Sequence, residues 1–433
     1  MKKSSLFIFV TIAHFGFGFP HLRAAETPSK YTEAYPEAAS KKGLQVEIVD
    51  DALELGVRHA ALNLDLCRVI APDRPHSKDS WQSGDRRFTF NSSYVERLDR
   101  SIKPLSDAGV LVNLILLAYQ SGSPAINKIL LHPKYDSKAP NRLGAFNTAT
   151  PEGRAWLDAT LSFLAERWSR PAQDKGRVVG YIVGNEVNSH WWWSNMGRVS
   201  LETFVEEYHQ TVRLFHRSIR SQSSWARVYL SLEHHWSIAY PPADEGQAFP
   251  GRPFLDHFNE LAKKNGDFDW HLAYHPYPES LFDPKFWEDT TALPEITTPR
   301  ITFKNLPVLS QYLDQKHLKF NGKRRRVILS EQGFHTPDSP DGELIQAAAY
   351  CYAYKIVEQD KGIDAFILHR HVDHPHEGGL HLGLRDYFED RPERPKKKIY
   401  DCFKFADTPR WKQTFEFALP IVGLEAWPNS SAY

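Results

Sequence analysis

Short apolar runs of strand length alternate with amphipathic helical stretches from about residue 45 to residue 405 of this 433-residue chain. The runs cover residues 57–64, 110–118, 178–185, 227–233, 268–274, 326–330 and 363–369. Because they are apolar on both faces, they are typical of parallel strands that helices cover on each side. This alternation restricts the chain to a (β/α)8 barrel or a doubly wound sheet. Of the two, we predict the α/β barrel (TIM barrel).

A barrel needs an eighth strand, which has to be its first. Residues 45–55 have the pattern of a helix that precedes the first clear strand. Strand one must then lie near residues 30–44, where no strand signal exists, so we expect it to be short or irregular. Residues 119–150 and 278–304 are long insertions that each follow a strand. We expect both as βα loops at the mouth of the barrel, where substrate specificity is usually built.

The beginning of the chain has the layout of a secretory signal. Two lysines precede an apolar stretch from Leu6 to Phe19, and small residues follow around Ala24. We therefore predict a signal peptide over 1–24, a catalytic barrel over 25–405 and a C-terminal segment over 406–433 that packs on the barrel. No other run is long and apolar enough to cross a bilayer. The mature protein is expected to be secreted or periplasmic, without an integral membrane segment.

The charge balance and the cysteines exclude several classes of function. Lys plus Arg equals Asp plus Glu at 53 each, so no net field favours a nucleic-acid partner. The three cysteines, Cys67, Cys351 and Cys402, are too few and too scattered for a disulfide framework or a metal site. We expect no cofactor.

Two carboxylates follow predicted strands directly. Glu186, preceded by Asn185, comes after the run that begins at Val178, and Glu331 comes after the run that begins at Arg326. A carboxylate at the carboxyl end of a parallel strand faces the open mouth of a barrel. Two such groups cleave a glycosidic bond when one is protonated and the other is ionised.

Counted back from the C-terminus, Glu186 ends strand four and Glu331 ends strand seven, while His275-Pro276-Tyr277 ends strand six. In this order the residues resemble the clan-A retaining glycoside hydrolases, a (β/α)8 superfamily with family-5-like and family-39-like members. The resemblance covers roughly residues 45–405 in architecture. It implies a β-linked substrate, Glu186 as acid/base and Glu331 as nucleophile. It further implies that Asn185 binds the sugar 2-hydroxyl, that Tyr277 holds Glu331 and that His275 orients the site.

The chain departs from the clan pattern at two strand ends. Many members carry an Arg near the end of strand two, but here Asn63 lies at that end and Arg68 only beyond it. A Trp often ends strand eight, where this chain has residues 368–371, Leu-His-Arg-His. Both departures favour an unusual substrate.

Neighbouring side chains suggest the nature of that substrate. Trp191 and Trp192 follow Glu186 and offer rings that stack on sugar faces, although a buried loop anchor would also explain them. Donor groups gather after strands five and eight: His234, His235, Arg370, His371 and His374. Because donors suit carboxylate or sulfate, we predict a uronic or sulfated sugar, the alternative being that these are ordinary polar loop residues.

Two other functions stay open. The histidines between His369 and His376 have the density of a zinc cluster, which would make the protein a metal-dependent barrel hydrolase. That hypothesis leaves Glu186 and Glu331 unexplained. A carbohydrate-binding barrel without catalysis is the other alternative. Our expectation is a retaining β-glycoside hydrolase whose partner is a carbohydrate and which holds no metal.

Overall fold

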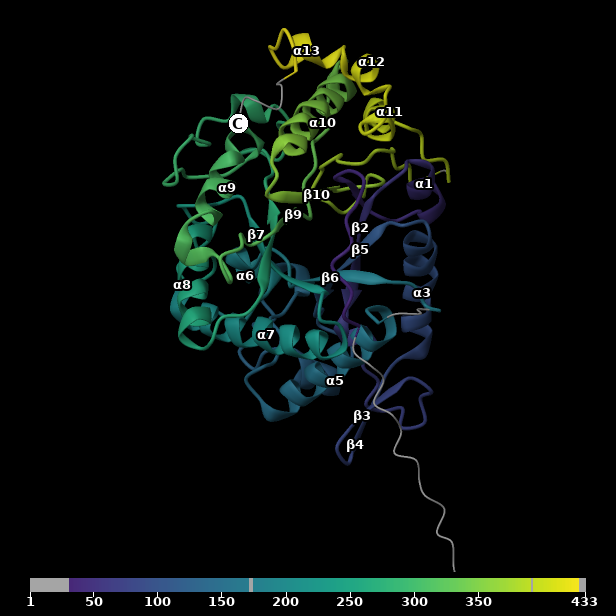
Figure 1. Ribbon diagram of the computed structural model, residues 1–433, viewed down its shortest axis with the longest axis vertical. Coiled ribbons are helices and arrows are strands. Elements are labelled where there is room, and N and C mark those ends of the chain that lie inside the picture. Colours follow the sequence, from purple (N-terminus) through teal and green to yellow (C-terminus); the bar gives the residue numbers. More distant parts are fainter. Residues whose placement is uncertain (1–30, 171–173, 391, 428–433) are drawn as a thin grey trace, which may run out of the picture.

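The computed structural model describes residues 31–170, 174–390 and 392–427, and it contains the predicted (β/α)8 barrel (Figure 1). Eight parallel strands close on themselves in the order β1-β10-β9-β8-β7-β6-β5-β2. The strands are β1 (Lys42–Gln45), β2 (His59–Asp65), β5 (Leu111–Leu117), β6 (Val178–Val183), β7 (Arg227–Glu233), β8 (Trp270–His275), β9 (Val327–Leu329) and β10 (Ile363–Leu368). The seven predicted strands are all present.

The first strand is short, as predicted. β1 has four residues and pairs in parallel with β10 on one side and β2 on the other. Its Lys42 is only 1% exposed and forms an ion pair with Asp407, which lies 365 residues further along the chain. The helix expected over 45–55 begins later, as α1 (Val49–Glu54), because β1 extends to Gln45.

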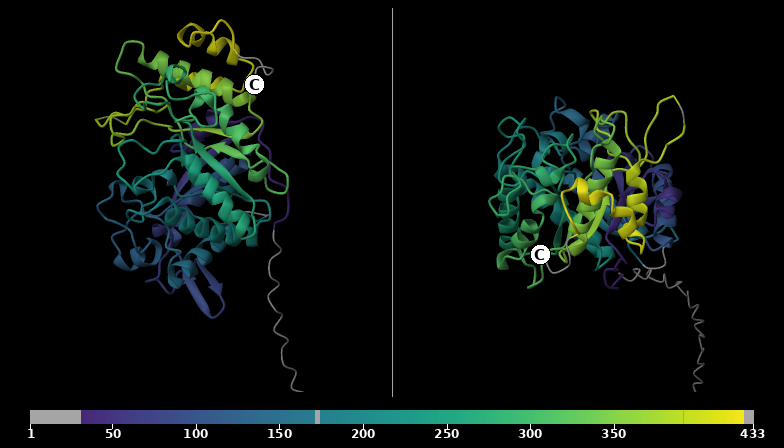
Figure 2. Two further views of the ribbon diagram at one scale, coloured as in Figure 1. Left: turned by 90° about the vertical axis from the view of Figure 1, so that its left-hand side faces the viewer. Right: turned by 90° about the horizontal axis from the view of Figure 1, so that it is seen from above.

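Helices alternate with the strands and surround the barrel (Figures 1 and 2). The longer ones are α3 (Ser92–Asp107), α5 (Pro151–Trp168), α7 (Leu201–Gln222), α8 (Gly251–Lys264), α9 (Pro307–Leu313), α10 (Gly342–Gln359) and α11 (Lys398–Phe405). Capping explains several of the starts: the Asn91, Thr150 and Ser200 side chains each accept a hydrogen bond from a backbone N–H in the first turn of the helix that follows.

The predicted insertions are βα loops at the carboxyl end of the barrel. The loop after β5 contains α4 (Pro124–Leu130) and the 3-10 turn η1 (Pro140–Arg142). The loop after β8 contains η3 (Phe286–Glu288) and η4 (Phe303–Asn305), and η5 (Lys316–Leu318) follows α9. A hairpin of β3 (Ser80–Ser83) and β4 (Arg86–Thr89) follows the short α2 (Leu66–Val69). Apart from η5, which lies in the connection from α9 to β9, these elements belong to loops that follow strands.

The inside of the barrel is filled by small and branched side chains. Ala61, Ile182, Ala273, Ile328 and Ile367 come from five different strands and form one buried cluster. All residues of β5, β6 and β8 are buried, as expected for strands covered on both faces. This packed interior holds the strand ends rigidly, so side chains just beyond them take defined positions.

The C-terminal segment packs on the outside of the barrel. α12 (Trp411–Phe415) and α13 (Ala418–Ile421) lie with α11 beside α10, at the top of Figure 1. Phe415, Ala418 and Val422 belong to the main hydrophobic core. The predicted signal peptide lies outside the described residues, and none of the described helices is long and apolar enough to span a membrane.

Candidate active site

Three strand ends bring Glu186, His275 and Glu331 together. Glu186 follows β6, the fourth barrel strand, His275 ends β8, the sixth, and Glu331 follows β9, the seventh. One carboxylate oxygen from each Glu and one ring nitrogen of His275 all lie within 4.8 Å of one another. Retaining glycosidases hold their two carboxyl groups about 5 to 5.5 Å apart, and inverting ones about 6.5 to 9.5 Å. The observed spacing falls on the retaining side.

An irregular turn after β6 positions Glu186. Gly184 and Glu186 have φ values of 78° and 40°, so both adopt left-handed conformations. This conformation is costly for a residue with a side chain and persists where the surroundings impose it, often at functional sites. Here the backbone N–H of Glu186 donates to the Ser231 hydroxyl on β7, at 2.9 Å. Asn185 lies in the same turn and is buried, with 8% of its surface exposed.

His275 links Glu186 to the strand that carries Glu331. Its Nδ1 lies 2.8 Å from Oε1 of Glu186, and its Nε2 lies 3.0 Å from the Ser330 hydroxyl. Burial raises the pKa of Glu186, and the negative charges of Glu331 and Glu233 add to this against the opposing effect of His275. The pKa of His275 is raised as well, because the bond to Glu186 and the nearby carboxylates outweigh its burial. The raised pKa values favour the protonated forms of both Glu186 and His275.

Glu331 is held in the opposite state. Burial alone would raise its pKa, but the nearby His369 and His275 side chains and two hydrogen-bond donors lower it below its usual value. The donors are Nε2 of Gln45, 3.0 Å from Oε2, and the Tyr277 hydroxyl, 3.3 Å from Oε1. The two carboxyl groups thus differ as acid and base chemistry requires, one favouring its proton and the other its charge.

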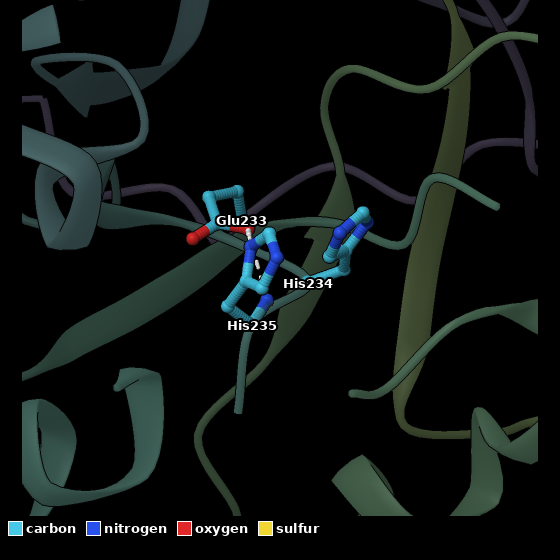
Figure 3. A group of neighbouring side chains, drawn as sticks. All are labelled: Glu233, His234 and His235. Atoms are coloured by element: carbon cyan, nitrogen blue, oxygen red, sulfur yellow. Dashed lines mark hydrogen bonds and ion pairs between the residues drawn. The ribbon is translucent and has the colours of Figure 1, made fainter. Parts of the chain in front are cut away.

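His235 is positioned by a buried carboxylate at the end of β7 (Figure 3). Oε2 of Glu233 accepts from the backbone N–H and from Nδ1 of His235, at 2.9 and 2.6 Å, and Oε1 accepts from Asn188 and Ser189. In Figure 3 the ring of His234 points away from this carboxylate, and its Nδ1 lies 3.1 Å from a backbone carbonyl oxygen. Both oxygens of Glu233 already have partners, so the group orients His235.

The three tryptophans after Glu186 have different surroundings. They form α6 (His190–Trp193), and each is half-buried. Trp191 lies near the guanidinium of Arg198, and Trp192 packs edge-on against Tyr240 with 4.9 Å between ring centres. Trp193 packs against the cluster that fills the barrel interior. Trp193 therefore lies closer to the barrel axis than the two tryptophans selected from the sequence.

Arg370 was predicted to bind an anionic substrate, but it contacts two carboxylates of the protein. Its Nη2 donates to Glu47 at 2.8 Å, and its Nη1 donates to Glu377 at 3.4 Å. A guanidinium shared between two carboxylates has little remaining attraction for a third anion. The basis for the predicted negative charge on the substrate is weakened accordingly.

His371 was predicted to bind substrate, but the structure buries it against an acidic residue of α1. It is fully buried, with Nε2 2.8 Å from Asp51, and its Nδ1 accepts from two backbone N–H groups at 3.3 Å. Asp51 also binds Arg385 and Tyr400, so the imidazole belongs to a buried cluster of polar side chains. The sequence shows the imidazole but not its partner 320 residues earlier.

The zinc cluster predicted as an alternative does not form. His369 and His371 bind different carboxylates, and His374 and His376 are exposed. Among the described residues, two groups of three have metal-binding proximity: Glu186 with His275 and Glu331, and Glu233 with the two histidines that follow it. Neither contains a member of the His369–His376 stretch.

Comparisons with known proteins agree with this architecture. Residues 34–430 match a protein family described as "Family of unknown function (DUF5722)". The chain belongs to the DUF5722 family. No curated protein sequence matches it.

Solved structures similar to this DUF5722 chain include a family 39 glycoside hydrolase from the gut symbiont Bacteroides cellulosilyticus WH2, with a TM-score of 0.55 and 13% identity over 85% of this chain. The chain spans 63% of the length of that enzyme. The hyperthermophilic β-glucosidase from Pyrococcus furiosus has a TM-score of 0.51 and 15% identity, with 86% of each chain covered. These likenesses show the barrel fold of the clan that the sequence resembles.

Several residues at the mouth were not predicted from the sequence to be catalytic or substrate-binding. Gln45 ends β1, the strand without a sequence signal, and it reaches Glu331. His369 and Glu377 follow β10 and bind each other, at 2.6 Å between Nε2 and Oε1. Tyr119 follows β5, is 38% exposed and lies close enough to Glu331 for that carboxylate to raise its pKa, after the larger effects of burial and Asp65. The sequence indicated Tyr119 only as an aromatic residue just after a predicted strand, and His369 only as a member of the alternative zinc cluster.

Proposed function

We propose that this protein is a retaining glycoside hydrolase that cleaves a β-linked sugar by double displacement. The proposal rests on one observation: two carboxylates with opposite pKa shifts meet at 4.8 Å or less at the mouth of a (β/α)8 barrel. The fold and the order of the motifs along the chain support it. Asn185, which directly precedes the acid, carries an amide suited to the sugar 2-hydroxyl.

The reaction follows from the two protonation states. Glu186 donates its proton to the glycosidic oxygen while Glu331 attacks the anomeric carbon, so the bond to the leaving group breaks as an ester bond to Glu331 forms. Glu186, now ionised, takes a proton from water, and the resulting hydroxide displaces Glu331 from the anomeric carbon. Two inversions leave the sugar with its original β configuration.

Azide rescue tests the two roles separately. With an aryl β-glycoside as substrate, Glu331→Gly should lose activity by several orders of magnitude and, with azide, give the α-glycosyl azide. Glu186→Ala should instead give the β-glycosyl azide, because the covalent intermediate still forms. Products are identified by proton NMR. Wild-type protein that binds oligosaccharides but hydrolyses none would favour the carbohydrate-binding alternative, and an α product released by the wild type would exclude retention.

For the substrate, we propose a sugar that presents neutral hydroxyl groups near Glu331, in place of the anionic sugar expected from the sequence. Arg370, His371 and His235 each already have a carboxylate partner.

Matched aryl glycosides test this charge preference. We expect kcat/KM to be higher for an aryl β-glucoside than for the corresponding β-glucuronide, with little dependence of either on salt. A strong preference for the glucuronide that falls with rising salt would restore the anionic substrate. A panel of other neutral sugars would then identify the natural one.

We also propose that the protein is exported, on the strength of its charged and apolar N-terminus. Expression with the complete N-terminus, fractionation of the cells and N-terminal sequencing of the product measure this directly. Cleavage near residue 24 is the expected result. Full-length protein retained in the cytoplasm would exclude it.

A further inference from the structure

Three neighbouring strand ends connect Glu331 to a second imidazole. Around the barrel, β10 lies between β9 and β1. Glu331 follows β9, His369 follows β10 and Gln45 ends β1. We propose that His369, protonated on both ring nitrogens and held by Glu377, is a positioning residue that keeps the nucleophile Glu331 ionised. It acts through the amide of Gln45, and its role as described rests on the proposed function.

The orientation of the Gln45 amide shows that the Nδ1 nitrogen of His369 is protonated. Its Nε2 faces two acceptors, Oε2 of Glu331 at 3.0 Å and the carbonyl oxygen of Ser330 at 3.3 Å. The NH2 end of the amide must therefore lie on that side, and Oε1 faces Nδ1 of His369 at 2.8 Å. An amide oxygen only accepts, so Nδ1 carries a hydrogen.

The other ring nitrogen faces a carboxylate. Nε2 of His369 lies 2.6 Å from Oε1 of Glu377, and Arg370 donates to the same oxygen at 3.4 Å. Burial would raise the pKa of Glu377, but its bond to His369 and its proximity to Arg370 lower it below the usual value. The Arg370 guanidinium on the same oxygen favours an ionised Glu377 by itself, and an ionised carboxylate only accepts, so Nε2 also carries a hydrogen and the ring is an imidazolium.

The hydrogen bonds run outward from His369 in two directions. Nε2 donates to Glu377, while Nδ1 donates to Gln45 and Gln45 in turn donates to Glu331, so the positive ring lies behind the amide dipole. Next to burial, His369 is the strongest influence on the pKa of Glu331, and it acts downward. The other ionisable groups that influence Glu331 or Glu377 electrostatically, or bind them, are His275, Glu186, Tyr277, Tyr119 and Arg370, with Glu47 beyond Arg370.

His369→Gln tests the proposal because glutamine can bond to Gln45 and to Glu377 but carries no charge. We expect the acidic limb of kcat/KM, which reports ionisation of Glu331, to move upward by about 1 pH unit. The alkaline limb should stay in place. Glu377→Gln, which removes the partner of the imidazolium, should move the same limb in the same direction and serves as a second variant if the first does not fold.

The matched control is His371→Gln. It removes an imidazole two positions further along, which is held by Asp51 and has no contact with Glu331. Its acidic limb should coincide with that of the wild type. An acidic limb that moves equally in His371→Gln, or not at all in His369→Gln, would overturn the proposal.

NMR separates this proposal from the proposed function because it needs no substrate. In protein labelled on Glu side chains with 13C, Glu331→Gln assigns the Glu331 carboxyl signal, whose titration should move upward in His369→Gln. The 15N signals of the His369 ring, assigned by their loss in His369→Gln, should show two protonated ring nitrogens at pH 7. If both NMR results are obtained but the protein has no hydrolase activity, the proposal for His369 stands and the proposed glycosidase function is excluded. Activity with an unshifted Glu331 signal, or with one bare ring nitrogen, would exclude the network alone.

Discussion

Replacing His275 by Gln should move the entire pH profile of kcat/KM upward. Activity requires Glu186 protonated and Glu331 ionised, so it falls as the pH rises through the pKa of Glu186 and as it drops through that of Glu331. The imidazole lowers the pKa of both groups. Glutamine can keep a bond to Glu186 but carries no charge, so both limbs are expected at higher pH than in the wild type.

The geometry gives the size of the shift. A unit charge on His275 within 4.8 Å of Glu331 contributes about 3.5 kcal/mol at an effective dielectric constant of about 20, equal to about 2.5 pH units. Gln45 and Tyr277 remain as donors and take over part of this effect. We therefore expect the acidic limb to rise by at least about 1 pH unit, which is the lower end of shifts caused by a close opposite charge.

The assay is initial-rate hydrolysis of an aryl β-glycoside between about pH 3 and pH 9, across the reference pKa values of Glu and His. Thermal unfolding monitored by circular dichroism verifies that the variant folds. His369→Gln is the matched comparison, because it should move the acidic limb alone. An optimum of His275→Gln that stays in place, or a profile in which the limbs move in opposite directions, would refute the assigned contacts.

Three further outcomes follow from single contacts. Tyr277→Phe removes a 3.3 Å bond to Glu331 and should lower kcat about 5- to 10-fold, with KM changed less than about 2-fold in steady-state assays. Arg370→Ala should leave the ratio of kcat/KM for a β-glucoside and a β-glucuronide unchanged, whereas a selective loss on the glucuronide would reinstate Arg370 as an anion site. Asp51→Asn should lower the free energy of unfolding by about 3 to 5 kcal/mol at pH 7 in denaturant titrations. Because His371 and Arg385 hold the pKa of Asp51 below its usual range, that difference should shrink as the pH falls below about 4.

Most of the barrel could be predicted because its strands are apolar on both faces. β1 is different: two of its four residues, Lys42 and Gln45, are polar. Lys42 is buried only because Asp407 compensates its charge from the C-terminal segment. A window of local sequence contains no trace of that partner, so the pattern that identifies the other strands fails here.

The same reason separates the site residues that were found from those that were missed. Glu186, His275 and Glu331 directly follow or end clear strands, so counting strands was enough to bring them together. The roles of Arg370 and His371 depend on acidic partners that lie more than 300 residues earlier in the chain. Residue type alone suggested anion binding there, whereas the fold had already neutralised both side chains.

The two departures from the clan pattern have a common physical explanation. A nucleophilic carboxylate that is buried needs positive charge nearby to stay ionised. The clan Arg near the end of strand two is absent, and Arg68 lies against the ring of Tyr94. In the same barrel the residue after strand eight is His369 and not Trp, and it reaches Glu331 through Gln45. In its proposed role, His369 therefore supplies to Glu331 the positive charge that the Arg provides in the clan pattern.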